Sequence, residues 1–342
     1  MTALPRLRLV VPVLVPVLAT ALALGLTASP PARADDGGIA WSVQTADNAN
    51  GTGRANFAYA VDPGAVVSDT MIVVNTGTEA LPLSVYAADA FTAASGEIDV
   101  LTDGTPSQDA GTWVSVERTS VELAPGESVE IPFTVTVPAD ARPGDHSAGI
   151  VTSLTSRDAA SSLSVDRRLG TRINLRVAGD LAPAATATSL TARYEPSWNP
   201  FESGRVIVEY SLENTGNTRL TGADTISVDG PLSATTTPTQ LPEIVTGSTI
   251  EAARAMPAFS FGWIAGRATI EPEGVGLGAG TVAPIVAEFG IVAIPWSLYA
   301  LILAVLVVGF AVLLIVRRRA RRRASANDAG AEKRAAEATQ AV

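Results

Sequence analysis

Two apolar runs, one near each end of the chain, constrain this sequence more than any other feature. The first, Leu9 to Leu26, follows two arginines and is followed by Ala32-Arg33-Ala34. A basic start, an apolar centre and a site of small residues are the three parts of a secretory signal peptide. The sequence therefore predicts that residues 1–34 direct export, and it leaves open whether this peptide is cleaved after Ala34 or kept as a second anchor.

The second apolar run, residues 291–316, contains no charged residue and is followed by an arginine cluster, Arg317 to Arg323. About 20 helical residues cross the hydrocarbon core of a bilayer, and a flanking basic cluster stays on the cytoplasmic side. The sequence predicts a single-pass type I protein of the cell membrane with an extracellular part and a basic cytoplasmic tail, residues 317–342. The expected interface residues are Trp296 and Tyr299 outside and Arg317, Arg318 and Arg319 inside.

Composition excludes several functions for the segment between these runs. Residues 35–295 contain 13 arginines, no lysine and 31 acidic residues, a formal charge of −18, so this part should repel nucleic acid. The tail carries +5 and suits anionic lipid headgroups. Cysteine is absent, which excludes disulfides, thiolate metal sites and a cysteine nucleophile.

Short runs rich in Val, Ile and Thr, separated by Gly, Pro, Asn and Asp, predict an all-β fold for this exported part. The clearest strand is SVEIPFTVTVP at 128–138, in which every second residue from Val129 to Val137 is apolar. Such alternation indicates one buried and one wet face. Four further runs of similar composition favour immunoglobulin-like sandwiches: 71–74, 82–86, 113–116 and 149–154.

A partial internal repeat predicts two sandwiches in tandem. Asn75-Thr76-Gly77 and Asn214-Thr215-Gly216 are 139 residues apart, and each follows an alternating strand. Asn and Gly tolerate the positive φ of a tight connection. We expect one domain over residues 39–180, a hinge at Leu181, a second domain over 181–272 and a flexible Gly-rich stalk over 273–290.

Catalytic and metal sites have little support in the sequence. The only histidine, His146, lies between Asp145 and Ser147, but adjacent residues of a strand point to opposite faces and cannot form a Ser-His-Asp triad. The pattern favours a structural histidine. Four acids that could serve a glycosidase instead lie in turn-rich sequence: Glu97, Asp99, Asp103 and Asp109. The same acids, or Asp47 with Asn48 and Asn50, could hold calcium, but their spacing does not match the twelve-residue calcium loop, and no cofactor or metal is predicted.

Aromatic residues are few, and one group is a candidate binding platform. Trp198 lies in the Pro- and Asn-rich segment YEPSWNPFESG together with Tyr194 and Phe201, which suits an exposed surface for a sugar or a protein. Trp41 and Trp113 lie in strand-like sequence and are expected in the core.

The first predicted domain resembles the peptidoglycan-binding domain of the WxL-interacting proteins, a family of Gram-positive surface proteins. Three segments carry the resemblance: NFAYAVDPGAVVSDTMIVVNTG at 56–77, YAADAFTAASGEIDV at 86–100 and VELAPGESVEIPFTVTVPADARPGDHSAGIVTS at 121–153. It implies a peptidoglycan-binding sandwich followed by a second sandwich, one span and a basic tail. The Ala- and Arg-rich, nearly lysine-free composition indicates a high-GC, actinobacterial relative.

The sequence therefore predicts a membrane-anchored, non-enzymatic surface protein that binds peptidoglycan or a secreted or surface protein. The candidate contacts are Tyr194, Trp198, Phe201, Glu97 and Asp99. Two alternatives stay open: a cell-wall hydrolase or peptidase that uses the acidic residues, and a structural spacer or assembly subunit of a larger complex.

Overall fold

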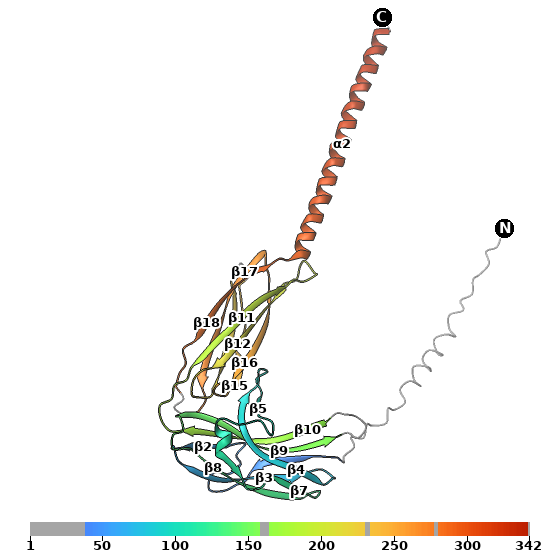
Figure 1. Ribbon diagram of the computed structural model, residues 1–342. Helices are drawn as coiled ribbons and strands as arrows, with labels where there is room; N and C mark the ends of the chain where they lie inside the picture. The colour runs from blue at the N-terminus through green and yellow to red at the C-terminus, as the bar shows by residue number, and fades with distance from the viewer. Residues whose placement is uncertain (1–37, 158–163, 230–232, 277–279, 341–342) are drawn as a thin grey trace, which may run out of the picture.

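Two β-sandwiches in tandem, followed by one long helix, make up the protein (Figure 1). The computed structural model describes residues 38–157, 164–229, 233–276 and 280–340. The predicted all-β, immunoglobulin-like fold with a C-terminal helix is confirmed. The predicted signal peptide, residues 1–34, lies outside the described residues.

The first sandwich packs a four-stranded sheet of order β1-β3-β8-β6 against a sheet of order β2-β10-β9-β4-β5, in which β7 also pairs with β4. The strands of the first sheet are β1 (Trp41–Thr45), β3 (Val66–Asn75), β6 (Val114–Val116) and β8 (Ser128–Thr136). The strands of the second are β2 (Phe57–Val61), β4 (Leu81–Thr92), β5 (Ile98–Val100), β7 (Ser120–Leu123), β9 (Gly144–Arg157) and β10 (Ser164–Val177). A short 3₁₀ helix, η1 (Ala110–Trp113), precedes β6. The pairs are antiparallel except β10 with β2, which is parallel.

The core of this sandwich follows the alternation that the sequence predicted. On β8 the side chains of Ile131, Phe133 and Val135 are buried. Phe133 meets Phe57 of the opposite sheet edge to face, with ring centroids 4.8 Å apart. Trp41 is buried too, and its indole N–H donates to Thr152 Oγ1 at 2.8 Å, so the two sheets are joined by a polar bond as well as by apolar packing.

The second sandwich packs a three-stranded sheet of order β11-β12-β16 against a sheet of order β14-β13-β17-β18, in which β15 pairs with β13. The first sheet contains β11 (Ala185–Glu195), β12 (Gly204–Asn214) and β16 (Thr249–Ala258). The second contains β13 (Leu220–Asp229), β14 (Ala234–Thr235), β15 (Thr239–Ile244), β17 (Gly262–Gly274) and β18 (Ile285–Ala293).

Strand β18 corrects two predicted boundaries. Residues 285–290 belong to an ordered strand that pairs with β17 along its length, so the predicted stalk over 273–290 is wrong in its second half, and the second domain extends past residue 272. Ile285, Phe289 and Ile291 alternate inward along β18, and this period of two was hidden in the sequence by neighbouring glycines. The helix therefore begins at Trp296 rather than at residue 291.

The internal repeat corresponds to a repeated turn built on a buried asparagine. Asn75 Nδ2 donates to the carbonyl oxygens of Glu79 and Leu123 at 2.8 and 3.0 Å. Asn214 Nδ2 donates to those of Thr218 and Ile244 at 2.8 and 2.9 Å. Both asparagines are fully buried. Each amide thus ties the turn after its strand to another strand of the same sandwich.

These turns require glycine for a different physical reason from the predicted one. Gly77 and Gly216 do not have the positive φ that the sequence suggested. A Cβ on Gly77 would lie 2.2 Å from the Gly38 carbonyl oxygen, and one on Gly216 would lie 2.3 Å from the Ala184 nitrogen. Glycine is therefore required because the backbone of a neighbouring segment passes too close for a side chain.

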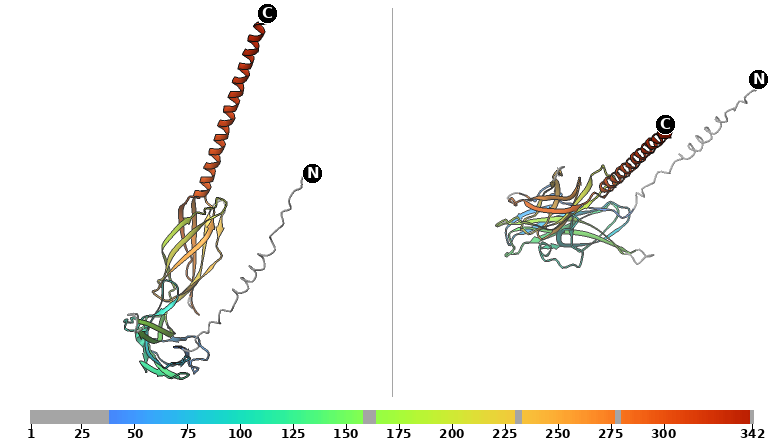
Figure 2. Two further views of the ribbon diagram at one scale, coloured as in Figure 1. Left: turned by 90° about the vertical axis from the view of Figure 1, so that its right-hand side faces the viewer. Right: turned by 90° about the horizontal axis from the view of Figure 1, so that it is seen from above.

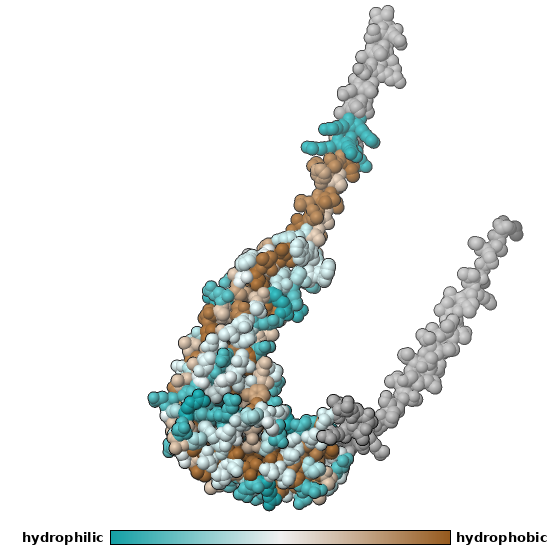
Figure 3. Space-filling model, in the orientation of Figure 1, coloured by the Kyte–Doolittle hydropathy of each residue, from teal (hydrophilic) through white to brown (hydrophobic). Residues whose placement is uncertain are grey.

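The helix α2 (Trp296–Gln340) leaves the end of the second sandwich that lies away from the first (Figures 1 and 2). Its segment Trp296–Arg322 is long and apolar enough to cross a membrane, and none of that segment is buried in the protein. Figure 3 shows this apolar segment next to the sandwich, followed by a hydrophilic band. Arg317, Arg318 and Arg319 follow the apolar residues directly.

Replacing Asn214 with alanine should lower the free energy of unfolding by about 1–3 kcal/mol, because two buried carbonyl groups lose their donor. Urea unfolding of the full chain in micelles measures the loss. The control is Asn56→Ala, which removes a half-buried asparagine to which the structure gives no side-chain hydrogen bond. Equal stability of the two variants would contradict the role assigned to Asn214.

Candidate functional site

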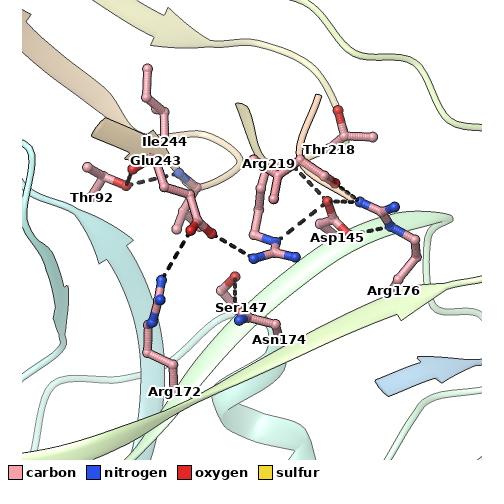
Figure 4. A network of polar contacts seen from close by, with 12 residues as sticks. Thr92, Asp145, Ser147, Arg172, Asn174, Arg176, Thr218, Arg219, Glu243 and Ile244 are labelled. Carbon is pink, nitrogen blue, oxygen red and sulfur yellow. Dashed lines mark hydrogen bonds and ion pairs between the residues drawn. The ribbon is translucent and has the colours of Figure 1, made fainter. Parts of the chain in front are cut away.

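The two sandwiches meet at an ion-pair network centred on Asp145, the second residue of β9 (Figure 4). Its side chain is 1% exposed. Arg176 of β10 donates from Nε and Nη2 to the two carboxylate oxygens, each at 2.7 Å. The backbone N–H of Arg219, in the second sandwich, donates to Oδ2 at 2.8 Å. One buried carboxylate therefore binds both domains.

The network continues across the junction with alternating charge. Arg219 Nη1 donates to Glu243 Oε1 at 2.6 Å, and Arg172 Nη1 lies 3.5 Å from Glu243 Oε2. Arg172 belongs to the first sandwich and Glu243 to the second. Two ion pairs therefore join the sandwiches, Arg172 with Glu243 and Asp145 with Arg219. Taking charges out of water is unfavourable unless each finds a partner, and this favours the one arrangement of the domains that pairs them all.

The predicted hinge at Leu181 is tied to both sides of the junction through Asn217. Its amide Nδ2 donates to the carbonyl oxygens of Pro143 and Asp180 at 3.0 and 2.9 Å, and its Oδ1 accepts the Ala182 N–H at 2.6 Å. The Asn217 carbonyl oxygen accepts the Asp145 N–H at 2.7 Å. These bonds hold the connecting segment in place next to the ion pairs.

The end of β4 makes a second contact between the sandwiches. Thr92 Oγ1 donates to the Glu243 carbonyl oxygen at 3.0 Å and accepts the Val245 N–H at 2.9 Å, and the Thr92 N–H donates to Ser248 Oγ at 3.0 Å. Beyond it, Gly96 passes so close to Pro242 that a Cβ would lie 2.7 Å from the proline ring. The β4–β5 hairpin therefore packs closely against the second sandwich.

The structure does not bring the predicted contact residues into one site. Glu97 and Asp99 lie at the β4–β5 hairpin beside the junction, where Glu97 contacts Ser95 and Asp99 is 3.7 Å from Arg168. Trp198 and Phe201 lie in the loop between β11 and β12, which touches the start of α2.

Tyr194, the remaining predicted contact, is not part of an exposed platform. It packs partly buried against the core of the second sandwich. The predicted group of three aromatic residues therefore reduces to the two that are exposed, Trp198 and Phe201.

His146 is buried beside a cleft of about 810 Å³ between the domains. Its Nδ1 lies 2.7 Å from Asp109 Oδ1, its Nε2 lies 2.8 Å from the Arg142 carbonyl oxygen, and its ring packs on Trp113 with centroids 4.6 Å apart. Burial alone lowers the pKa of His146, but the bonds to Asp109 and to the Arg142 carbonyl outweigh burial and raise the pKa above its usual value of 6.5. Both ring nitrogens face acceptors, which suits the doubly protonated ring.

The geometry does not assemble a Ser-His-Asp triad from the adjacent residues. The Asp145 carboxylate faces Arg176, and Ser147 Oγ lies 3.4 Å from Asn174 Oδ1, so neither contacts the His146 ring. Histidine does have a carboxylate partner, Asp109, but its other nitrogen faces a backbone carbonyl where a triad needs a hydroxyl.

The candidates near the end of β1 bond to groups of the first sandwich. Asn48 and Asn50 donate their side-chain amides to Asp69 at 2.7 and 3.0 Å, and Asp47 accepts the Gly53 N–H at 2.7 Å. Within the described ranges, no three His, Cys, Asp or Glu side chains gather as a metal site would require.

Strand β10 has a free edge that the sequence did not predict. It pairs with β9 over its whole length, but β2 covers only Ile173–Val177 of its other side. Residues 164–172 have no strand partner on that side among the residues that the structure describes. In Figure 1 the β9–β10 hairpin extends sideways from the junction, under the second sandwich, and Figure 3 shows the concave outline on this side.

The main-chain groups on this edge can be assigned from the alternation of the strand. The Ala178 N–H donates to Val61 of β2, and the Leu169 carbonyl oxygen faces β9, where it accepts Thr152 Oγ1. Even-numbered residues therefore point away from β9, so the backbone groups of Asp166, Arg168 and Gly170 face the free edge. The exposed side chains of Val165 and Leu169 lie on one face of it.

No protein-family model and no curated protein matches the chain. Solved structures of fimbrial chaperones are similar to it. A chain of the chaperone–tip adhesin complex of CFA/I fimbriae has 10% identity and a TM-score of 0.34 over 73% of this chain and 98% of its own. The class 5 fimbriae chaperone CfaA has 11% identity and a TM-score of 0.31 over 74% and 100%.

A chain of the CsuC–CsuE chaperone–tip adhesion subunit complex of Acinetobacter baumannii has 10% identity and a TM-score of 0.32 over 73% of this chain and 97% of its own. Superpositions this loose carry no argument about function, and the fold described above rests on the strand pairing of this chain.

Removing the central carboxylate should weaken the junction strongly. Asp145→Ala leaves Arg176 and Arg219 near the interface without their shared partner, and breaking a buried pair in this way costs about 3–5 kcal/mol. Urea unfolding of the full chain measures the loss, and hydrogen exchange at the Val245 amide, which donates to Thr92 across the junction, reports opening of the junction. Asp229→Ala is the control, because its pair with Arg267 is exposed and 3.7 Å long.

The single histidine gives a direct test of the Asp109 contact. The imidazole signals of His146 should titrate above pH 6.5, because the folded protein favours the charged ring. The stability from this contact is then complete below about pH 6.5 and is lost as the pH rises through the raised pKa. NMR titration measures the pKa. Asp109→Asn should lower it, whereas Asp140→Asn, which removes an exposed acid of a nearby loop, should not.

Proposed function

We propose that this protein is a non-enzymatic, membrane-anchored surface protein that binds a partner protein at the free edge of β10. The unpaired backbone from Ser164 to Arg172 carries this proposal. An exposed edge offers N–H and C=O groups to an added strand, and alternate side chains beside it give specificity. Val165 and Leu169, four residues apart and therefore on the same face of the strand, are exposed.

The rest of the architecture supports a presenting role for this edge. The junction network holds the two sandwiches in one arrangement, so the hairpin keeps its direction relative to the second sandwich. The second sandwich passes into the apolar helix through only two residues, Ile294 and Pro295. In this proposal the sandwiches lie outside the cell and α2 spans the membrane, in line with the arginines that follow it.

The non-enzymatic assignment rests on where the candidate catalytic groups lie. Glu97, Asp99 and Asp109 have different partners, namely Ser95, Arg168 and His146. A glycosidase requires two carboxyl groups that face one scissile bond. Each of these three acids instead contacts its own partner. The hydrolase alternative is therefore the weaker hypothesis.

Peptidoglycan is a second candidate ligand. It is favoured by the resemblance of the first sandwich to the peptidoglycan-binding domain of the WxL-interacting proteins, and it needs no strand edge. The formal charge of −18 on residues 35–295 argues against anionic wall polymers, because exposed like charges are only partly screened at about 0.15 M salt.

The β10 edge can be tested by a pair of variants at one position. Arg168→Pro removes an outward N–H and leaves the ladder with β9, whereas Arg168→Ala removes the same side chain and keeps that N–H. With a photo-crosslinking amino acid at Val165 in the full chain in its own cells, we expect a discrete protein adduct. The adduct should be lost with proline and kept with alanine.

Two outcomes would contradict this proposal. Equal adducts from the proline and alanine variants would show that the main chain of the edge does not bind the partner. Retention of the purified full chain on isolated cell-wall sacculi, unchanged by Arg168→Pro and without any protein adduct, would favour peptidoglycan as the ligand.

A further inference from the structure

Exposed aromatic residues gather at the end of the second sandwich from which α2 leaves. Trp198 is 97% exposed and Phe201 82% exposed in the β11–β12 loop. Phe261 lies between β16 and β17, and Trp263 is the second residue of β17; both are more than half exposed. Large aromatic rings are seldom left in water without a partner, and a group of them marks an interaction surface. The junction contacts lie at the other end of this sandwich, and the β10 edge belongs to the first sandwich, so neither accounts for the group.

Two hydrogen bonds fix these loops beside the first turn of the helix. Ser297 Oγ donates to the Ser197 carbonyl oxygen at 2.7 Å, and Tyr299 Oη donates to the Phe261 carbonyl oxygen at 2.6 Å. Ser197 directly precedes Trp198 in the chain. The aromatic loops are therefore held at the same level along the helix axis as residues 297–299.

The length of the apolar segment fixes where that level lies in a membrane. The 21 residues from Trp296 to Val316 span about 31 Å at about 1.5 Å per residue. The hydrocarbon core is about 30 Å thick. With Arg317 at the inner boundary, the outer boundary lies at the first turn of α2. Moving the sandwich away from the membrane would draw arginines into the hydrocarbon, which is strongly unfavourable.

We propose that the β11–β12 loop and the β16–β17 loop are a lipid-binding surface, inserted into the boundary between headgroups and acyl chains of a phospholipid bilayer. Trp198, Phe201, Phe261 and Trp263 join Trp296 and Tyr299 in one aromatic belt, the position that amphipathic rings favour in membranes. This surface replaces the predicted platform for a sugar or a protein at Trp198.

The chemistry of the loops indicates which property of the lipid they use. Glu195 and Glu202 lie in or beside the β11–β12 loop, and two basic residues lie near them: Arg205, and Arg193, whose Nε is 3.6 Å from Glu195 Oε1. Two acidic and two basic groups leave this surface without the excess of positive charge that would attract anionic lipid. The loops therefore bind through partition of the rings into the interface, and the insertion should not depend on anionic headgroups.

The insertion also gives the second sandwich three attachment points at the membrane: two loops and the helix. One helix alone leaves a domain free to swing about its exit point. Ser297 and Tyr299 bond both loops to the helix, so the three attachment points fix the orientation of the second sandwich relative to the bilayer. This inference does not depend on what the β10 edge binds.

Fluorescence quenching by brominated lipids tests the insertion in the full chain. The parent variant carries Trp263→Phe and Trp296→Phe in phosphatidylcholine nanodiscs, so that Trp41, Trp113 and Trp198 remain. A second variant adds Trp198→Phe, and the difference between their emissions belongs to Trp198. Bromine near the headgroup end of the acyl chains should remove most of this difference, with or without phosphatidylglycerol.

The remaining emission is the internal control, because Trp41 and Trp113 belong to the first sandwich, far from α2, and should keep their emission in brominated lipid. The proposal is overturned if bromine leaves the Trp198 emission unchanged while aqueous iodide quenches it, because the loop would then lie in water. Quenching that occurs only with phosphatidylglycerol would overturn the partition mechanism in favour of binding to lipid charge.

Discussion

The buried carboxylate of Asp145 is the interaction on which the shape of this protein depends. It receives two bonds from Arg176 and one from the Arg219 backbone, so the first and second sandwiches share one charge partner. Because that charge is shielded from water, losing one partner leaves an uncompensated ion, and intermediate arrangements of the domains are disfavoured. Glu243 and Arg172 extend the same constraint across the junction. The direction of the β9–β10 hairpin follows from it.

Each sandwich repeats one solution to a smaller problem, the connection after an alternating strand. In both, a buried asparagine bonds two backbone carbonyls, and a glycine lets another segment pass at close range. The second turn has an additional task, because Asn217 and Arg219 within and after it contact the first sandwich. Of the two repeated Asn-Thr-Gly turns, the second is therefore the one that takes part in the junction.

The two ends of the second sandwich differ in chemistry. At one pole, ions and amides hold the first sandwich; at the other, exposed aromatic rings surround the exit of α2. The apolar part of the helix is long enough to cross a bilayer, and in the proposed orientation this length sets the depth of the adjacent loops. In the proposed membrane orientation, the order from the bilayer outward is α2, the second sandwich, the junction and the free edge of β10.

The sequence by itself determined the local features: the alternating strands, the two Asn-Thr-Gly turns, the apolar span with its arginines, and the isolation of His146 from a triad. These are readable because each depends on spacing along one segment. Only the tertiary structure decided that Asp145 meets Arg219, that β18 replaces half of the expected stalk, that β10 keeps an edge unpaired by the described residues, and that the loop of Trp198 lies beside the start of α2. Each of these depends on which distant segments become neighbours, and a buried charge pair or a free edge leaves no periodic signal in the chain.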